Sequence, residues 1–161
     1  MLAIMQALGV RASALLVATC ATALTGCGDD QAPEAAAELW ARIQEEDYRG
    51  FARAPGYDSR RPTAAPHSDF VDIYVNDVVT MALGSSEPIV AWPTGSLIVK
   101  DGFSSDGDLE IVAVMEKRTD GWFWAEYFEF GSGEARFSGK PDTCLNCHES
   151  GADYVRAFGF P

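Results

Sequence analysis

Two cysteines and a histidine stand close together near the C-terminus, in the string CLNCHES at residues 144–150. Cys144 and Cys147 are separated by two residues, and His148 follows directly. Two thiols at this spacing can add across the two vinyl groups of a haem while the adjacent imidazole reaches the iron. The string therefore predicts one covalently bound haem c, held by Cys144 and Cys147, with His148 as an axial ligand of the iron.

Two other chemistries use the same residue types. A structural zinc site needs four ligands, and His67, the second of the two histidines, would have to be the fourth. Adjacent Cys147 and His148 are awkward ligands for one ion. A redox dithiol is typical of a C-x-x-C that follows a strand in a βαβ unit, whereas this motif follows an antiparallel run. Both alternatives stay open beside haem.

The N-terminal segment is of a different kind from the rest of the chain. Its first 27 residues, MLAIMQALGVRASALLVATCATALTGC, carry a single charge, and the apolar run at 12–24 is short for a membrane span. LTGC, at 24–27, resembles the lipobox of bacterial lipoproteins, which implies a lipid on Cys27. An incidental cysteine after an ordinary signal is the alternative.

These features predict three segments: a lipoprotein signal peptide at 1–26, a polar tether at 27–37 and one domain at 38–161. The protein is then exported, anchored by lipid to a membrane of the bacterial envelope and facing the periplasm. Export also favours haem, because c-type haem is attached outside the cytoplasmic membrane. Cys20 leaves with the signal, so only the pair in the motif remains in the domain.

Composition excludes one class of partner. The chain has 161 residues, 47% of them hydrophobic, and a formal net charge of −12. A surface this acidic repels nucleic acid, so no nucleic-acid partner is expected.

The pattern of apolar residues and turns predicts a single α+β domain. It has one antiparallel β-sheet, an N-terminal helix and a C-terminal helix that carries the haem. The expected helices are 34–48, 77–86 and 143–158, the expected strands are 70–76, 95–101, 109–118 and 121–131, and 53–69 is expected to be a long loop.

Four strings carry a resemblance to a known family: PHSDFVDIYVN, PTGSLIVKD, VAVMEKRTDGWFWAEY and GKPDTCLNCHESGADYV. Together they resemble the cytochrome P-460 family, which includes the c′-beta cytochromes, from about residue 40 to 158. The resemblance implies an antiparallel β domain, often a homodimer, with the motif histidine on the iron and an open, apolar opposite side. Members of this family oxidise hydroxylamine or bind nitric oxide and other small gases.

Lys100 is the residue on which the resemblance depends most. In cytochromes P-460 a lysine at the end of a G-x-x-x-V-K strand is bonded to the porphyrin edge, and GSLIVK places Lys100 there. The bond requires an unprotonated amine held against the ring. The other lysines are Lys117 and Lys140, and the alternative for Lys100 is an ordinary solvated lysine at a strand end.

The residues that would decide the iron's reactivity are less well defined. Donors for a sixth ligand are His67, Met81 and Met115; carboxylates that could take protons near the iron are Asp101, Glu126 and Asp142; aromatic residues that could line the pocket are Phe103, Phe123, Trp124 and Phe128.

The sequence thus favours a mono-haem cytochrome that oxidises hydroxylamine or a related nitrogen compound and passes electrons to a redox protein. The alternatives are a protein that binds nitric oxide or another gas, and a six-coordinate electron-transfer cytochrome c.

Overall fold

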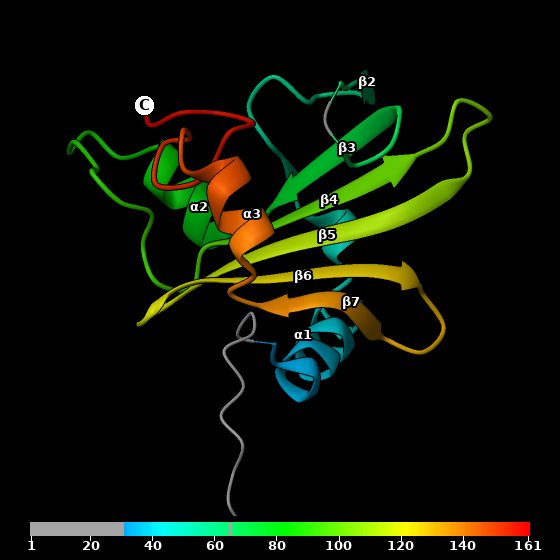
Figure 1. Ribbon diagram of the computed structural model, residues 1–161. Helices are drawn as coiled ribbons and strands as arrows, with labels where there is room; N and C mark the ends of the chain where they lie inside the picture. The colour runs from blue at the N-terminus through cyan, green and yellow to red at the C-terminus, as the bar shows by residue number, and fades with distance from the viewer. Residues whose placement is uncertain (1–30, 65) are drawn as a thin grey trace, which may run out of the picture.

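The computed structural model describes residues 31–64 and 66–161 (Figure 1). Within them the chain forms a single antiparallel sheet and three α-helices, which confirms the α+β prediction. The helices are α1 (Pro33–Glu45), α2 (Asp77–Leu83) and α3 (Asp142–His148), with a 3₁₀ turn η1 (Tyr48–Gly50). The strands are β1 (Ala52–Arg53), β2 (Arg61–Pro62), β3 (Phe70–Val75), β4 (Leu97–Phe103), β5 (Leu109–Arg118), β6 (Gly121–Glu129) and β7 (Glu134–Gly139).

The sheet follows chain order, β1-β3-β4-β5-β6-β7, with β2 also paired to β3. Short turns join β4 to β5, β5 to β6 and β6 to β7, and each such pair is antiparallel, as expected for hairpin connections. Because side chains alternate along a strand, each strand presents one set of residues to each face of the sheet.

One face, here the α1 face, is covered by α1 (Figure 1). Leu39 and Ile43 lie four residues apart on the helix and are almost completely buried against Val99 and Val114 of the sheet. Burying each of these aliphatic side chains contributes about 1.5–3 kcal/mol to stability. The N-terminal helix therefore closes one half of the core.

The other face, here the motif face, lies under α2, α3 and the C-terminal segment (Figure 1). Ile98, Met115 and Trp124 are in register across β4, β5 and β6, and they form one cluster with Cys144 and Val155. The C-x-x-C-H motif consequently packs on the opposite side of the sheet from α1.

Several predictions of local structure were wrong. The loop expected at 53–69 contains the short strand β2, and β7 was not predicted at all. The C-terminal helix ends at His148 rather than at 158, because the chain turns sharply at Gly151, where a Cβ would lie 2.5 Å from the Val155 carbonyl oxygen. The i, i+4 pair expected on a helix, Tyr154 and Phe158, therefore lies outside any helix.

The N-terminal predictions fall mostly outside the described part of the chain. The signal peptide expected at 1–26 and the lipid site expected at Cys27 both lie outside the described residues. Helix α1 begins at Pro33, inside the segment expected to be a tether, and Ala36 is fully buried. Among residues 31–64 and 66–161, no helix has the length and apolar character that a membrane span requires.

Candidate haem-attachment site

Helix α3 brings the motif residues to one side of a short helix. Cys144 and Cys147 are three residues apart and His148 is four residues from Cys144, so all three share one helical face. Cys144 is buried, Cys147 is exposed, and the two thiols are not joined in a disulfide. The two cysteines thus lie about one turn apart on α3, one buried and the other exposed.

The imidazole of His148 is held by a backbone group. Its Nδ1 lies 2.9 Å from the carbonyl oxygen of Tyr154. Because a carbonyl only accepts, Nδ1 must carry the proton, which leaves Nε2 with a free lone pair on the other side of the ring. Burial lowers the pKa of His148, so the ring is kept neutral. A neutral imidazole with a fixed tautomer is the form that binds iron.

Two side chains, one from the sheet and one from a loop, lie beside this imidazole. The Trp124 ring lies 4.6 Å from the His148 ring and the His67 ring 6.4 Å from it, measured between centroids. Trp124 Nε1 and His67 Nδ1 are both buried and form no hydrogen bond with any described residue. Two buried polar atoms without a hydrogen-bond partner beside His148 fit a site that is completed by a bound group.

Lys100 lies on the motif face, because it is two residues from Ile98 on β4 and therefore on the same side of the sheet as α3. It occupies a row with Ala113 of β5 and Glu126 of β6, and its amine is largely buried. Burial, reinforced by the Arg156 charge, lowers the pKa of Lys100 to about 8, although Glu126 opposes the shift. The Lys100 side chain is therefore half-buried rather than fully exposed to solvent.

His67 reaches the same face from the loop before β3. Gly102 permits this, since a Cβ at that position would lie 2.7 Å from the His67 carbonyl oxygen. Burial, followed by the charges of Lys100 and His148, lowers the pKa of His67 to about 3. Its Nδ1 is 3.4 Å from Glu126 Oε1, close enough for attraction but outside hydrogen-bond geometry.

The three carboxylates considered from the sequence lie in different places in the structure. Asp101 points to the α1 face, where it accepts hydrogen bonds of 2.7 Å from both Tyr48 Oη and Arg49 Nε. Asp142 is exposed in the first turn of α3. Glu126 alone lies on the motif face, and burial raises its pKa. Of these three carboxylates, Glu126 is therefore the one that lies beside His67.

Most of the aromatic residues and methionines considered from the sequence lie away from His148 or pack in the hydrophobic core. Phe123 belongs to the α1 face, Phe128 is 40% exposed, and Phe103 packs under the guanidinium of Arg60. Of the aromatic residues expected in the pocket, only Trp124 lies beside His148. Met81 is 68% exposed on α2, and Met115 packs in the core under α3.

Two contacts of the site could not have been found from the sequence. The Tyr154 carbonyl that holds His148 is a backbone atom, for which no residue type gives a signal. Arg156 donates from Nη1 to the Cys147 carbonyl oxygen at 3.1 Å and approaches its Sγ at 3.3 Å. The sequence shows that Arg156 follows the motif, but it gives no indication that this side chain returns to Cys147.

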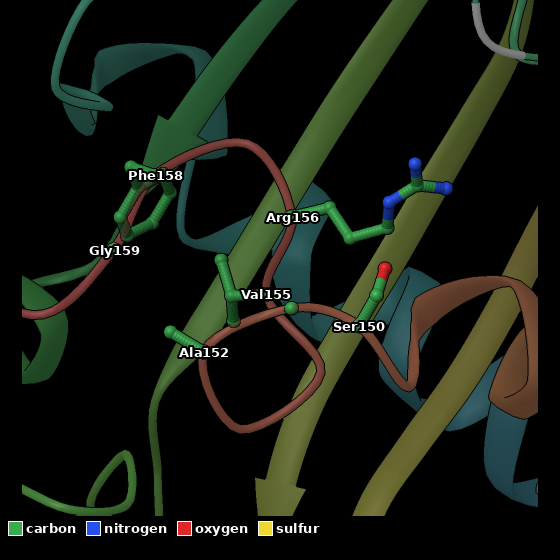
Figure 2. Close-up of a pocket in the computed structure, with 7 residues that line it drawn as sticks. Ser150, Ala152, Val155, Arg156, Phe158 and Gly159 are labelled. Carbon is green, nitrogen blue, oxygen red and sulfur yellow. The ribbon is translucent and has the colours of Figure 1, made fainter.

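The segment after α3 borders a hollow of about 250 Å³ (Figure 2). It is lined by Ser150, Gly151, Ala152, Val155, Arg156, Phe158 and Gly159. This volume is below the roughly 300–1,000 Å³ of ligand pockets, so the hollow cannot enclose a porphyrin by itself. Figure 2 shows Arg156 extending along the side on which Ser150 lies, away from Phe158.

Comparison with known proteins does not assign the chain to a family. No protein-family model matches the chain, and a search of curated proteins gives no match. The chemistry of the site must therefore be argued from its own residues.

Proposed function

We propose that this protein is a c-type mono-haem cytochrome that oxidises hydroxylamine or a related small nitrogen compound on the side of the haem opposite His148. The observation that carries the proposal is the arrangement on α3. Two thiols share one helical face with an imidazole whose Nδ1 donates to a carbonyl and whose Nε2 is left to bind iron.

Covalent attachment needs only the two thiols and the two vinyl groups. In each addition a bond forms from sulfur to one vinyl carbon, and the thiol hydrogen goes to the other carbon, so no oxidant is consumed. Cys144 and Cys147 would make these thioethers, and His148 Nε2 would be the axial ligand. The bound haem would supply a site for one-electron chemistry and for binding a small ligand.

Lys100 supports a further bond to the haem edge. Its pKa of about 8 leaves an appreciable fraction of neutral amine near neutral pH, which an exposed lysine lacks. A bond from Nζ to a ring carbon removes one N–H and one C–H hydrogen. The step therefore releases two electrons and two protons and requires an oxidant of the peroxide class.

Glu126 supports oxidation of a protonated substrate. Oxidising hydroxylamine to nitroxyl releases two electrons and two protons; the electrons would go to an external redox protein, and a carboxylate is needed for the protons. Burial raises the pKa of Glu126 toward neutrality, so it can both accept a proton and release it to solvent. No other carboxylate of the three considered lies on this face.

One observation favours a second candidate, a six-coordinate electron-transfer cytochrome. His67 is neutral, buried and 6.4 Å from His148 between ring centroids. Two imidazoles that bind one iron from opposite sides lie at about this separation. His67 as sixth ligand would block the position at which hydroxylamine or nitric oxide must bind.

The optical spectrum of the haem-loaded protein separates the candidates. The proposal predicts a five-coordinate, high-spin haem that responds to nitric oxide and hydroxylamine-dependent reduction of an added electron acceptor. A low-spin spectrum that becomes high-spin in His67→Ala would establish the electron carrier instead. A nitric oxide response without hydroxylamine oxidation would leave the gas-binding function.

The location of the protein follows from the N-terminal segment alone. We propose that Cys27 carries a lipid and holds the domain at a membrane of the bacterial envelope, on the periplasmic side, and that the domain acts as a homodimer. Membrane fractionation of the full chain and of Cys27→Ala tests the anchor, since the variant should be released. Sedimentation of the mature domain tests the homodimer, which a monomeric mass would exclude.

A further inference from the structure

The residues after α3 form a tight turn in an uncommon conformation. Ala152 and Val155 exchange two backbone hydrogen bonds, of 2.9 and 3.1 Å, around Asp153 and Tyr154. Both central residues have a positive φ, which is 47° at Asp153 and 68° at Tyr154. Such turns usually use glycine or asparagine at both positions, so here the backbone is strained and must be held by its surroundings.

The end of the sheet supplies that support. Lys117 Nζ lies 2.9 and 2.8 Å from the two carboxylate oxygens of Asp153, and the backbone N–H of Trp92 donates to the same carboxylate at 2.9 Å. The indole of Trp122 donates to the Asp153 carbonyl at 2.8 Å. Lys117 and Trp122 are paired across β5 and β6, so the anchors are themselves in a rigid element.

This ion pair is shielded from water. The side chains of Lys117 and Asp153 are 16% and 14% exposed, whereas Asp120 in the Lys140–Asp120 pair is 68% exposed. A shielded pair with additional hydrogen bonds fixes a geometry more firmly than an exposed one. The fixed geometry includes the next carbonyl along the chain, that of Tyr154, which accepts from His148 Nδ1 at 2.9 Å.

We propose that Lys117 and Asp153 are positioning residues that set, through the Tyr154 carbonyl, the strength of the bond between His148 and the haem iron, and hence the reduction potential. The inference rests on the proposed haem. A firmly held acceptor makes the imidazole a stronger donor to iron and stabilises the ferric state. Loosening the turn weakens this hydrogen bond and favours the ferrous state.

The test uses the haem-loaded protein with Lys117→Gln, Lys117→Arg and Asp153→Asn, and Lys140→Gln as the matched control from an exposed pair. The readouts are covalent haem on a denaturing gel, the iron–histidine stretching frequency and an equilibrium redox titration. Lys117→Gln and Asp153→Asn should keep their haem, lower the stretching frequency and raise the ferrous-to-ferric ratio about tenfold at a fixed potential. Lys117→Arg should restore both values, and Lys140→Gln should change neither.

Unchanged frequency and potential in Lys117→Gln, with only a lower melting temperature, would overturn the inference and leave the pair a purely structural one. That result would leave the proposed function standing, because haem would still be attached. A wild-type chain without covalent haem would overturn the proposed function as well. If Asp153→Asn does not fold, the Lys117→Gln and Lys117→Arg pair gives the same decision.

Discussion

Lys100 and Glu126 lie in one row of the sheet, on either side of Ala113 and on the same face. Neighbouring strands are about 4.8 Å apart, so the two backbones are separated by roughly 10 Å, and only a small residue lies between them. The attraction between the two charges partly offsets the desolvation of the Lys100 amine. An amine and a carboxylate thus share the motif face of the sheet.

The first prediction concerns the protonation of Lys100. Only the neutral amine can form the bond to the haem edge, and the fraction of neutral amine rises as pH passes the Lys100 pKa of about 8. The rate of cross-linking after addition of peroxide should therefore rise with pH and level off above about pH 9. Mass spectrometry of proteolysed protein measures the haem bound to the peptide that contains residue 100.

Lys100→Arg is the matched variant, because it keeps a positive charge that stays protonated throughout this range. It should show no bond to the peptide at any pH, while Lys140→Arg should behave as the wild type. A cross-link with the same rate at pH 6 and pH 9, or one that survives in Lys100→Arg, would rule out this role for the lysine.

A second prediction concerns Glu126. Glu126→Gln keeps the size and polarity of the side chain but removes its capacity to accept a proton, so hydroxylamine oxidation should fall by about 10²–10⁴-fold. Binding of nitric oxide should change little. Steady-state reduction of an electron acceptor and nitric oxide titration measure the two effects.

Glu110→Gln, on an exposed position of the neighbouring strand β5, is the control and should leave the rate unchanged. An undiminished rate in Glu126→Gln would show that substrate protons leave by another route.

The Tyr48–Asp101 hydrogen bond gives a prediction for stability. Burial and this bond raise the pKa of Tyr48 above its ordinary value of 10.0. The unfolded chain loses the tyrosine proton above pH 10 while the folded chain keeps it, so stability falls as pH rises further. Tyr48→Phe should cost about 1–3 kcal/mol at pH 7 and reduce this alkaline loss.

Denaturant unfolding at pH 7 and at pH 11 measures both effects, with the half-buried Tyr57→Phe as control. An alkaline loss of equal size in Tyr48→Phe and wild type would contradict the assignment.

The sequence was most informative where local patterns decide structure. Strand-forming residues between two turn sequences predicted a strand at 109–118, which is β5, and a helix was predicted across Cys144, Cys147 and His148, which lie on α3. The sequence was least informative where the outcome depends on tertiary contacts. The α-helix expected to continue through Tyr154 is replaced by a turn that Lys117 and two tryptophans hold from the sheet.

The choice among carboxylates shows the same limit. Asp101 and Glu126 both occur in strands with similar neighbours, and a shift of one residue in register exchanges the two faces of a sheet. The two faces are distinguished only by the pairing of β4 with β5 and of β5 with β6. This pairing shows that Asp101 faces Tyr48 and that Glu126 faces the motif.

The central claim is that Cys144 and Cys147 bind one haem covalently. The most direct measurement is the mass of the denatured domain, purified from cells that attach c-type haem, compared with that of the Cys144→Ser/Cys147→Ser double variant. The account predicts that the wild type carries the added mass of one haem and that the double variant has the mass of the chain alone. A wild-type domain with unmodified mass, or a double variant that keeps its haem after denaturation and carries no bond at Lys100, would contradict it.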